Sequence, residues 1–438
     1  MDEQEIKENI FSLVKEYYDK KKGKEYKKGD KINYAQPIFD HREINSVIDA
    51  LLKGWFGMSD KAREFQNRIS EYLNVHKTFL ANSGSSANLV AVSSLLSHKL
   101  EDPIKKKSEV LTPAVTFPTT LNPIIQNGLK PVLVDVDFNT LNADPEQLKE
   151  NCSKDTSLMF LPHTLGNPNE MDLIMDLVED YDLYLIEDNC DAFGSEYDGK
   201  KTGSFGTMST LSFYPAHHIT MGEGGAISIK ENDLKLERAI RSIRDWGRDC
   251  WCQGDEQSKL GACGKRFDWE IDGEAYDHRY IYSHIGYNLK PTEIMAAMGP
   301  AQMDRIEYMV SKRRKNYQYL YDKLKEYDDL LMIHTAYEKS NPSWFAFPMT
   351  IRDEAGFSRR EITTYLEDKN IQTRLIFAGN ITKQPAYKSV DFKIPFDLKN
   401  SKKVMHDSFF IGIHPSLEEA HLDYVHEVFE RFFTEVKE

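Results

Sequence analysis

Short apolar runs recur through the first half of the chain, and helical or polar segments separate several of them. This alternation is typical of buried strands in a mainly parallel sheet, because a parallel strand is reached only through a crossover segment. The runs cover residues 110–112, 132–134, 158–161, 183–186, 210–213 and 226–229. The sequence therefore predicts an α/β fold built on a mainly parallel sheet.

The pattern along the chain predicts three parts. Residues 1–34 are rich in Lys and Glu with apolar residues between them, which indicates an N-terminal helical extension. Residues 35–300 form the large α/β domain, interrupted by a polar, cysteine-containing insertion at 248–285. Residues 301–438 hold a linking helix and a smaller C-terminal α+β domain. We expect the linking helix to be one long helix that starts after Pro291 and runs to Leu324.

Composition narrows the possible partners. The formal net charge of −14 excludes nucleic acid as an expected partner, because counterion release needs a basic surface. No apolar stretch is long enough to span a bilayer and the first residues are acidic, so we expect no membrane contact and a cytoplasmic location. Five cysteines in 438 residues also fit a reducing compartment.

Residues 212–226 read Ser-Phe-Tyr-Pro-Ala-His-His-Ile-Thr-Met-Gly-Glu-Gly-Gly-Ala. This stretch resembles the active-site segment of the DegT/DnrJ/StrS-type sugar aminotransferases, which are pyridoxal-phosphate enzymes. The resemblance covers residues 35–435 and implies the aspartate aminotransferase-like fold (fold type I). That fold has a large domain with a mainly parallel seven-stranded sheet and a smaller C-terminal α+β domain.

His217 stands where the family carries the lysine that forms an imine with the cofactor, and no lysine occurs between Lys201 and Lys230. An imidazole cannot form that imine, but it can accept and return a proton near neutral pH. The resemblance therefore implies a protein that keeps the cofactor, uses His217 as the catalytic base, and has lost ordinary transamination. The neighbouring His218 is expected to point to the opposite side as a structural residue.

The same resemblance implies the contacts of the cofactor ring and phosphate. Asp188, at the end of an apolar run, would pair with the pyridine nitrogen, and Phe117 would stack on the ring. Asp191 would lie near the same ring and bind the cofactor. The phosphate would be held by the following residues at a helix start and a strand end: Gly84, Ser85, Ser86 and Ser212.

Two further elements resemble parts of the family's site. Asn288 and Lys290 lie in Gly-Tyr-Asn-Leu-Lys, an element whose asparagine reaches the phosphate of the other subunit, so the resemblance implies a homodimer. Lys290 replaces an arginine, which keeps the charge and loses the bidentate fork. Arg374 matches an element of the smaller domain and is a weaker candidate for binding a substrate diphosphate.

Four of the five cysteines form a group with the spacing C-x59-C-x-C-x10-C: Cys190, Cys250, Cys252 and Cys263. Such clustering in a cysteine-poor chain indicates metal ligands. A four-cysteine zinc site remains an alternative, although a lone C-x-C pair fits a zinc knuckle poorly. A [2Fe–2S] cluster also takes four thiolates and can transfer single electrons.

Histidine for lysine together with this cysteine group resembles one branch of the family, the 3-dehydrases of nucleotide-linked 4-keto-6-deoxyhexoses. The branch implies a lyase-type enzyme that holds pyridoxamine 5′-phosphate and a [2Fe–2S] cluster. It would remove the C3 hydroxyl of CDP-4-keto-6-deoxy-D-glucose in 3,6-dideoxysugar and O-antigen (lipopolysaccharide) biosynthesis. An NAD(P)H-dependent flavin or iron-sulfur reductase would supply the electrons. Three alternatives stay open: a cluster-free dehydrase recycled by glutamate, a nucleotide-sugar aminotransferase-like enzyme, and a zinc-stabilised protein that binds a nucleotide-sugar without catalysis.

Overall fold

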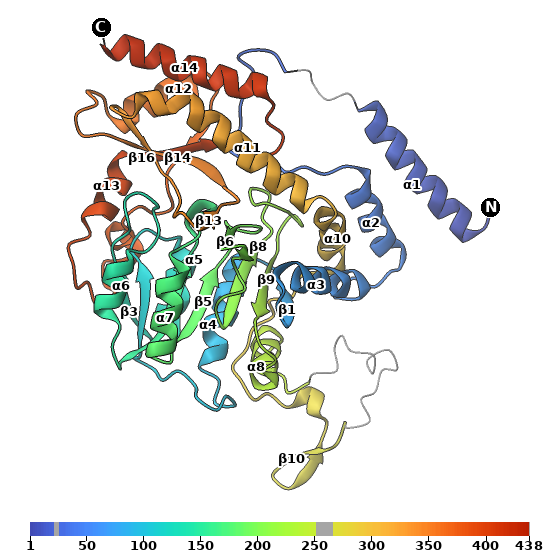
Figure 1. The fold of residues 1–438 in the computed structure, drawn as a ribbon. Coiled ribbons are helices and arrows are strands. Elements are labelled where there is room, and N and C mark those ends of the chain that lie inside the picture. The colour runs from blue at the N-terminus through green and yellow to red at the C-terminus, as the bar shows by residue number, and fades with distance from the viewer. Residues whose placement is uncertain (22–25, 251–265, 438) are drawn as a thin grey trace.

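The computed structural model describes residues 1–21, 26–250 and 266–437 (Figure 1). A seven-stranded sheet in the order β1-β9-β8-β5-β4-β2-β3 forms the centre of the larger part. Only β9 runs antiparallel to its neighbours β1 and β8, so the prediction of a mainly parallel sheet is confirmed. The strands are β1 Lys77–Ala81, β2 Glu109–Pro113, β3 Lys130–Val134, β4 Thr156–Pro162, β5 Tyr184–Asp188, β8 Met208–Ser212 and β9 Gly225–Ile229.

Six of these strands contain the six apolar runs of the sequence, and β1 is the strand that the pattern missed. The sequence around β1 predicts a helix up to Leu73 and another from Ala81, which leaves no strand between them. In the structure, helix α3 Asp60–Leu73 ends at Asn74, whose φ of 55° lies in the left-handed region. The chain then enters β1, which pairs along its whole length with β9.

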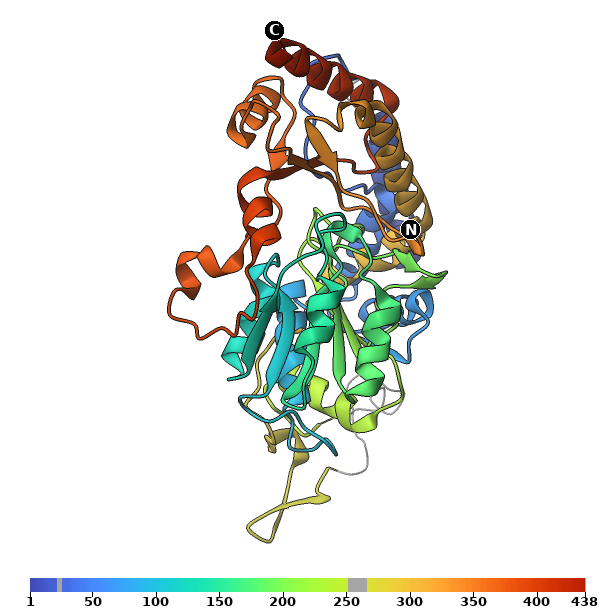
Figure 2. The same ribbon diagram turned by 60° about the vertical axis from the view of Figure 1, so that its left-hand side comes forward.

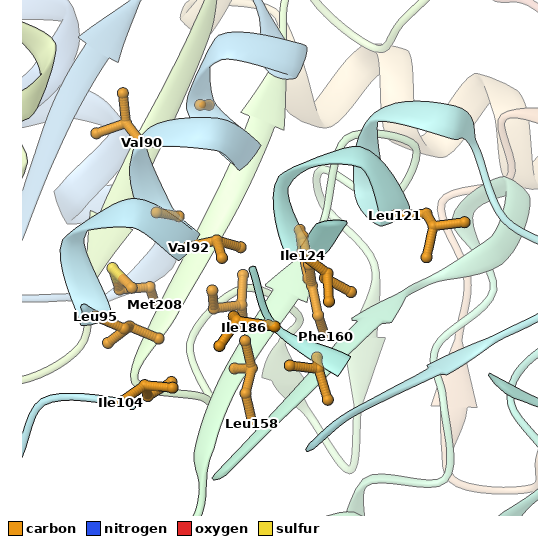
Figure 3. Packing of buried hydrophobic residues seen from close by; sticks show 14 of the residues in the cluster. Val90, Val92, Leu95, Ile104, Leu121, Ile124, Leu158, Phe160, Ile186 and Met208 are labelled. Carbon is orange, nitrogen blue, oxygen red and sulfur yellow. The ribbon is translucent and has the colours of Figure 1, made fainter. Parts of the chain in front are cut away.

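Helices cover both faces of the sheet because neighbouring residues of each strand point to opposite sides. On one face, residues of α4 Gly84–Leu95 and α5 Pro118–Gln126 lie over Leu158, Phe160 and Ile186 (Figure 3), and α8 Leu234–Arg244 packs beside α4 and β1 in the same core. On the other face, α6 Pro145–Asn151 and α7 Met171–Asp180 cover Met159 and Leu161. The alternation of residues 158 to 161 between the two cores explains why these strands read as continuous apolar runs.

The C-terminal part is built on a second sheet, which lies above the first in Figures 1 and 2. Its strand order is β12-β14-β16-β15 and all its pairs are antiparallel. The strands are β12 Leu331–Ile333, β14 Ala346–Ile351, β15 Thr373–Arg374 and β16 Ser408–Gly412. The helices of this part are α11 Ile306–Leu324, α12 Arg359–Asp368, α13 Lys399–Asp407 and α14 Glu419–Lys437.

The expected single helix after Pro291 is wrong, because this stretch forms three helices: α9 Glu293–Ala296, α10 Met298–Met303 and α11. Pro300 lacks the N–H that a continuous helix would use to bond the carbonyl of Ala296. Gly299 allows α10 to approach α3, since a Cβ there would lie 2.3 Å from the ring of Phe65. The break therefore lets α10 pack closely on α3.

The remaining elements lie at the edges. Helix α1 Glu3–Lys20 runs beside α2 His41–Leu52 and has no buried residue. A small sheet in the order β13-β6-β7 contains β6 Glu196–Tyr197, β7 Lys200–Lys201 and β13 Ser340–Asn341. The hairpin of β10 Trp269–Ile271 and β11 Glu274–Tyr276 projects away from the rest of the structure in Figures 1 and 2. None of the described helices has the length and apolar character required to cross a membrane.

Candidate active site

A cavity of about 340 Å³ lies at the carboxyl ends of β5 and β8, where it is covered by residues of the C-terminal part. Ligands of open α/β sheets bind at this edge, and the volume suits a cofactor with part of a substrate. Nine of the residues selected from the sequence line it: Gly84, Ser85, Phe117, Asp188, Cys190, Asp191, Ser212, His217 and Arg374. Ser86, Asn288, Lys290 and Cys250 do not line it, and Cys252 and Cys263 lie outside the described residues.

Asp188 is the last residue of β5, and its side chain is held from two helices. Oδ2 accepts hydrogen bonds from Asn88 Nδ2 at 2.9 Å and from Thr120 Oγ1 at 2.6 Å. The backbone N–H of Cys190 donates to Oδ1 at 3.3 Å. These contacts orient a carboxylate that is only 6% exposed toward the cavity. The sequence predicted a role for Asp188 but not for Asn88 and Thr120. Their position near the N-terminal ends of α4 and α5 is the one feature that could have suggested them.

The start of helix α4, where the sequence predicts a phosphate site, lies at the edge of the cavity. Ser83 caps the helix by accepting the N–H of Ser86 at 3.0 Å, so Ser86 completes the cap and does not face the cavity. Gly84 allows β8 to approach, because a Cβ there would lie 2.6 Å from Ser212 Cβ and 3.1 Å from Cys190 Sγ. Gly84, Ser85 and Ser212 are thus brought together at a helix N-terminus, which favours an anionic group.

Phe117 precedes α5, where Pro118 starts the helix. Its ring is 50% exposed and meets the edge of Phe377 with the centroids 6.3 Å apart. Because the ring lines the cavity and is not buried in the core, one face is free to stack on a flat ligand.

His217 lies in a turn after β8, and not in extended backbone as expected. Its N–H donates to the carbonyl of Tyr214 at 2.9 Å. The ring contacts Phe345, with the centroids 5.4 Å apart, and Nδ1 lies 3.3 Å from Asp191 Oδ1. His218 points away into the core, where its Nε2 is 2.7 Å from the carbonyl of Ser343. Burial and the nearby Arg313 lower the pKa of His218 well below its usual value, which fits a neutral structural residue.

Asn288 and Lys290 lie beside the helix α8 terminus, away from the cavity lining. Asn288 is exposed and forms a bridge with Asp245. Lys290 Nζ is 3.3 Å from Asp245 Oδ1 and 3.6 Å from the centre of the Trp246 ring. Burial lowers the pKa of Lys290, and the charge of Asp245 opposes this shift.

Arg374 lies at the mouth of the cavity and is exposed. Its guanidinium stacks on Tyr34 at 4.3 Å from the ring centre, and Nη1 donates to the carbonyl of Thr373 at 2.7 Å. The remaining N–H groups of Arg374 face a region that an anionic substrate can reach.

The described cysteines do not assemble the predicted four-thiolate site. Cys190 lies against Gly84, the first residue of α4. Cys250 follows Asp249, whose carboxylate binds Lys99 at 2.6 Å beyond the last turn of α4. A helix of 12 residues is about 18 Å long, so the two thiols lie toward opposite ends of α4. No group of three or more His, Cys, Asp or Glu side chains placed to hold a metal occurs within the described ranges.

The Cys190 thiol has a further property that bears on metal binding. Burial and the neighbouring carboxylate of Asp188 raise the pKa of this thiol well above its usual value. A metal bound here would have to displace the proton of this thiol. The prediction of a four-cysteine metal site is therefore not supported by the part of the chain that the structure describes.

The cavity fits pyridoxal phosphate in several respects. Asp188 is oriented for a pyridine nitrogen, Phe117 offers an aromatic face, and the α4 terminus with Ser212 offers a phosphate site. Two buried polar atoms at the cavity, His217 Nδ1 and Asp191 Oδ2, have no hydrogen-bond partner. Buried polar groups are normally paired, so the hydrogen bonds of this wall of the cavity are incomplete in the structure.

The family model of the DegT/DnrJ/EryC1/StrS aminotransferases matches residues 37–430, and this chain belongs to that family. The chain is 43% identical over 399 residues to the lipopolysaccharide biosynthesis protein RfbH of Salmonella typhimurium, covering 90% of each chain. It is 42% identical over 432 residues to the dTDP-4-dehydro-2,6-dideoxy-D-glucose 3-dehydratase of Saccharopolyspora spinosa, covering 98% of this chain and 92% of that protein. The predicted family and fold are thereby confirmed.

The fold is similar to that of a solved GDP-4-keto-6-deoxymannose-3-dehydratase, ColD, in a complex with GDP-perosamine. The TM-score is 0.81 at 29% identity, with 91% of this chain and 99% of that chain covered. A second structure of that enzyme, with a trapped PLP-glutamate geminal diamine, also has a TM-score of 0.81 at 28% identity. The larger sheet and the C-terminal sheet of this chain therefore follow the fold type I arrangement.

Proposed function

We propose that this protein is a pyridoxamine 5′-phosphate-dependent dehydratase that removes the C3 hydroxyl of a nucleotide-linked 4-keto-6-deoxyhexose. The observation that carries the proposal is the pocket itself, in which His217 occupies the lysine position while Asp188, Phe117 and Ser212 are all present. An aminotransferase needs the lysine, whereas a decayed protein has no need of an oriented Asp188. Relatives at 42% and 30% identity are named as 3-dehydratases of such sugars.

Each of the pocket residues would have a separate role in the proposed dehydration. When bound, the cofactor supplies an amine that condenses with the C4 ketone and a ring that accepts electrons. Asp188 holds a proton on the pyridine nitrogen, and Asn88 and Thr120 keep its carboxylate in that direction. Phe117 fixes the plane of the ring. His217 would take a proton from the cofactor carbon that bears the amine and pass it to the C3 hydroxyl, which would leave as water.

The nucleotide would lie toward Arg374 and Tyr34 at the cavity mouth. A guanidinium already stacked on an aromatic ring loses little freedom when it binds a diphosphate. We keep CDP-4-keto-6-deoxy-D-glucose as the proposed substrate, for 3,6-dideoxysugar and O-antigen biosynthesis in the cytoplasm. Relatives are named for dTDP-linked and GDP-linked sugars, so the nucleotide base of the substrate is to be tested first.

Net removal of the hydroxyl requires two electrons, and we propose a reductase that delivers them through a [2Fe–2S] cluster on the four cysteines. The second candidate is recycling of the cofactor by glutamate without a cluster. Two observations favour this candidate: the positions of Cys190 and Cys250 toward opposite ends of α4, and the glutamate adduct in a related solved structure.

We also propose a homodimer in which Asn288 reaches the phosphate of the partner subunit. Asn288 is exposed and outside the cavity of its own chain, and the neighbouring Ile285 is 99% exposed. Replacing Asn288 by Ala should weaken binding of the cofactor about tenfold, the scale of one lost hydrogen bond to a charged group, while the unfolding temperature stays unchanged. Retained activity in a form that sedimentation shows to be monomeric would contradict this composite site.

The test of the function is oxygen exchange. Enzyme loaded with pyridoxamine 5′-phosphate is incubated in ¹⁸O-water with the CDP-, dTDP- or GDP-linked 4-keto-6-deoxyhexose, and label at C3 is measured by mass spectrometry. Wild-type enzyme should exchange one of these sugars, and His217→Asn should lower the rate by about 10²-fold or more. Amino-sugar formation with glutamate and no exchange would instead establish an aminotransferase.

Reduction needs a separate assay on the same sugar. Consumption of NADH with a flavin-iron-sulfur reductase, together with iron and sulfide in anaerobically purified enzyme, would support the cluster. Turnover driven by glutamate alone in iron-free enzyme would support the second candidate.

A further inference from the structure

Asp191 was expected to contact the cofactor ring, but its position points to a different partner. The residue follows β5 in a turn closed by the bond from the Ala192 N–H to the Asn189 carbonyl at 3.1 Å. This turn brings Asp191 Oδ1 to 3.3 Å from Nδ1 of His217. Nδ1 is buried on that side, which leaves Nε2 as the ring nitrogen facing the cavity.

Two atoms of this pair have no other partner. His217 Nδ1 and Asp191 Oδ2 are both buried, and neither makes a hydrogen bond in the structure. A small shift of either side chain would satisfy both, because their groups are already within contact distance. Catalytic hydrogen bonds of this kind are often long in the free enzyme and tighten when the substrate is bound.

A buried cation lies close to this pair, on the other side of Phe345. Arg313 of α11 is 2% exposed, and its Nη1 donates to the carbonyls of Trp344 and Phe345 at 3.2 and 2.8 Å. The same Phe345 packs its ring on His217. Burial lowers the pKa of Arg313 to about 10, and the charge of Asp191 opposes this shift. The two buried charges therefore compensate each other.

We propose that Asp191 is a positioning residue that holds the proton of His217 at Nδ1, so that Nε2 faces the substrate, and that the buried charge of the nearby Arg313 supports this arrangement. The proposal rests on the proposed function, in which His217 is the base. The tautomer of a histidine is set by the bond that its other nitrogen makes, and a carboxylate is a common partner for this purpose. In this arrangement the unprotonated Nε2 of His217 is the nitrogen that accepts the proton from the substrate side of the cavity.

A double-mutant cycle separates this role from cofactor binding. Asp191→Asn should lower the rate of C3 oxygen exchange by about 10²-fold, while the dissociation constant for pyridoxamine 5′-phosphate changes less than about twofold. In the His217→Asn background the same change should lower the rate no further, because the carboxylate acts only through His217. Asp191→Glu should recover part of the rate. The matched control is Asp198→Asn, an exposed carboxylate in the β6–β7 turn.

A second readout does not depend on turnover. In enzyme labelled with ¹⁵N-histidine, the His217 signals are identified by their loss in His217→Asn. The wild-type spectrum should show the proton on Nδ1, and Asp191→Asn should show a mixture of both tautomers. Arg313→Lys should keep the Nδ1 form and Arg313→Met should lose it, with the adjacent Arg314→Met as control. If Arg313→Met does not fold, the Asp191→Asn and Arg313→Lys spectra still decide the point.

The outcomes distinguish the two proposals. If Asp191→Asn weakens cofactor binding and leaves the exchange rate and the tautomer unchanged, Asp191 is a cofactor contact and the inference is wrong. Additive losses in the double variant would also overturn it. If His217→Asn exchanges oxygen at the wild-type rate, the proposed function is wrong instead, and the tautomer spectra still report whether Asp191 orients His217.

Discussion

The predicted dehydration depends on the cofactor pocket, and the predicted electron delivery depends on the insertion at residues 248–285. The two regions differ in how the fold positions their residues. Pocket residues stand at the ends of β5 and β8 or at the start of α4, where core packing fixes the backbone. The described part of the insertion contacts the body near its two ends, where Asp249 pairs with Lys99 and His284 lies within hydrogen-bond distance of Ser97 and Ser242. Sheet topology therefore brings the pocket together, whereas Cys250, the cysteine of the insertion that the structure describes, does not lie at a strand end.

This difference explains why one kind of motif could be interpreted from sequence and the other could not. Parallel strands end at one edge of a sheet, so residues that follow several strands must converge there. Asp188, Ser212 and His217 meet for this reason. A cysteine in a long insertion has no such constraint, and Cys250 lies toward the end of α4 that is remote from Cys190.

The largest expected effect tests the pocket side of this comparison and concerns Asp188. Asp188→Asn removes the negative charge that, in the proposed mechanism, holds a proton on the cofactor ring, and we expect C3 oxygen exchange to fall by about 10³-fold. The control is Asp182→Asn, at the other end of β5, where the backbone φ of 52° suits asparagine. An unchanged exchange rate in Asp188→Asn would show that the pocket does not use an electron sink.

The second prediction concerns the insertion. Cys252→Ser should lower reductase-coupled deoxygenation by about 10²-fold if a [2Fe–2S] cluster is present, because three thiolates hold the cluster poorly. Oxygen exchange should survive, since it needs only the pocket. The control is Cys152→Ser, a buried cysteine outside the group. Loss of cofactor binding together with exchange would instead make the insertion part of the pocket, and unchanged reductase-coupled activity would exclude the cluster.

The third prediction concerns the stability of strand β5, which carries Glu187 next to the pocket residue Asp188. Glu187 is buried, and burial alone would raise its pKa, but His163 and the N–H groups of Gly206 and Gly203 lower it below the usual value. Glu187→Gln should reduce the free energy of unfolding at pH 7 by about 3 kcal/mol, because it weakens the hydrogen bonds that His163 and the backbone N–H groups make to a buried carboxylate. Denaturant titration with the wild type measures this difference.

The pH dependence of that difference has a definite sign. A folded-state pKa below the unfolded value of about 4.3 means that the stabilisation is complete above that pH and is lost as the pH falls through the folded pKa. The difference between wild type and Glu187→Gln should therefore be constant from pH 7 to pH 5 and shrink below pH 4. A constant difference down to pH 3 would contradict the assigned pKa direction.

The smallest effect is expected where the insertion joins the body. Lys99→Met removes the cation that binds Asp249, and a partly exposed pair of this kind contributes about 1 kcal/mol. Cofactor binding should not change, because Lys99 lies beyond the end of α4 that is remote from the pocket. Limited proteolysis of the insertion should become faster. A loss of cofactor affinity in Lys99→Met would show that the insertion and the pocket are coupled.

Much of the fold and part of the site could be predicted from the sequence. The six apolar runs became strands because their residues alternate between two buried faces. Strand β1 was missed because five residues between two helical patterns carry too little periodic signal. The break at Pro300 was missed because apolar spacing on both sides of it continued a helical pattern.

What the sequence determined by itself was the order of the elements, the family, and the exchange of lysine for histidine at His217. Each of these depends on residues close together in the chain. Tertiary structure alone decided which side chains touch: Thr120 bonds Asp188 from 68 residues away, and Asn88 from 100. It also decided that Asp191 faces His217 and that Arg313 binds the carbonyl of Phe345, whose ring contacts His217. Such contacts depend on how helices pack on a sheet, and local sequence patterns do not record that geometry.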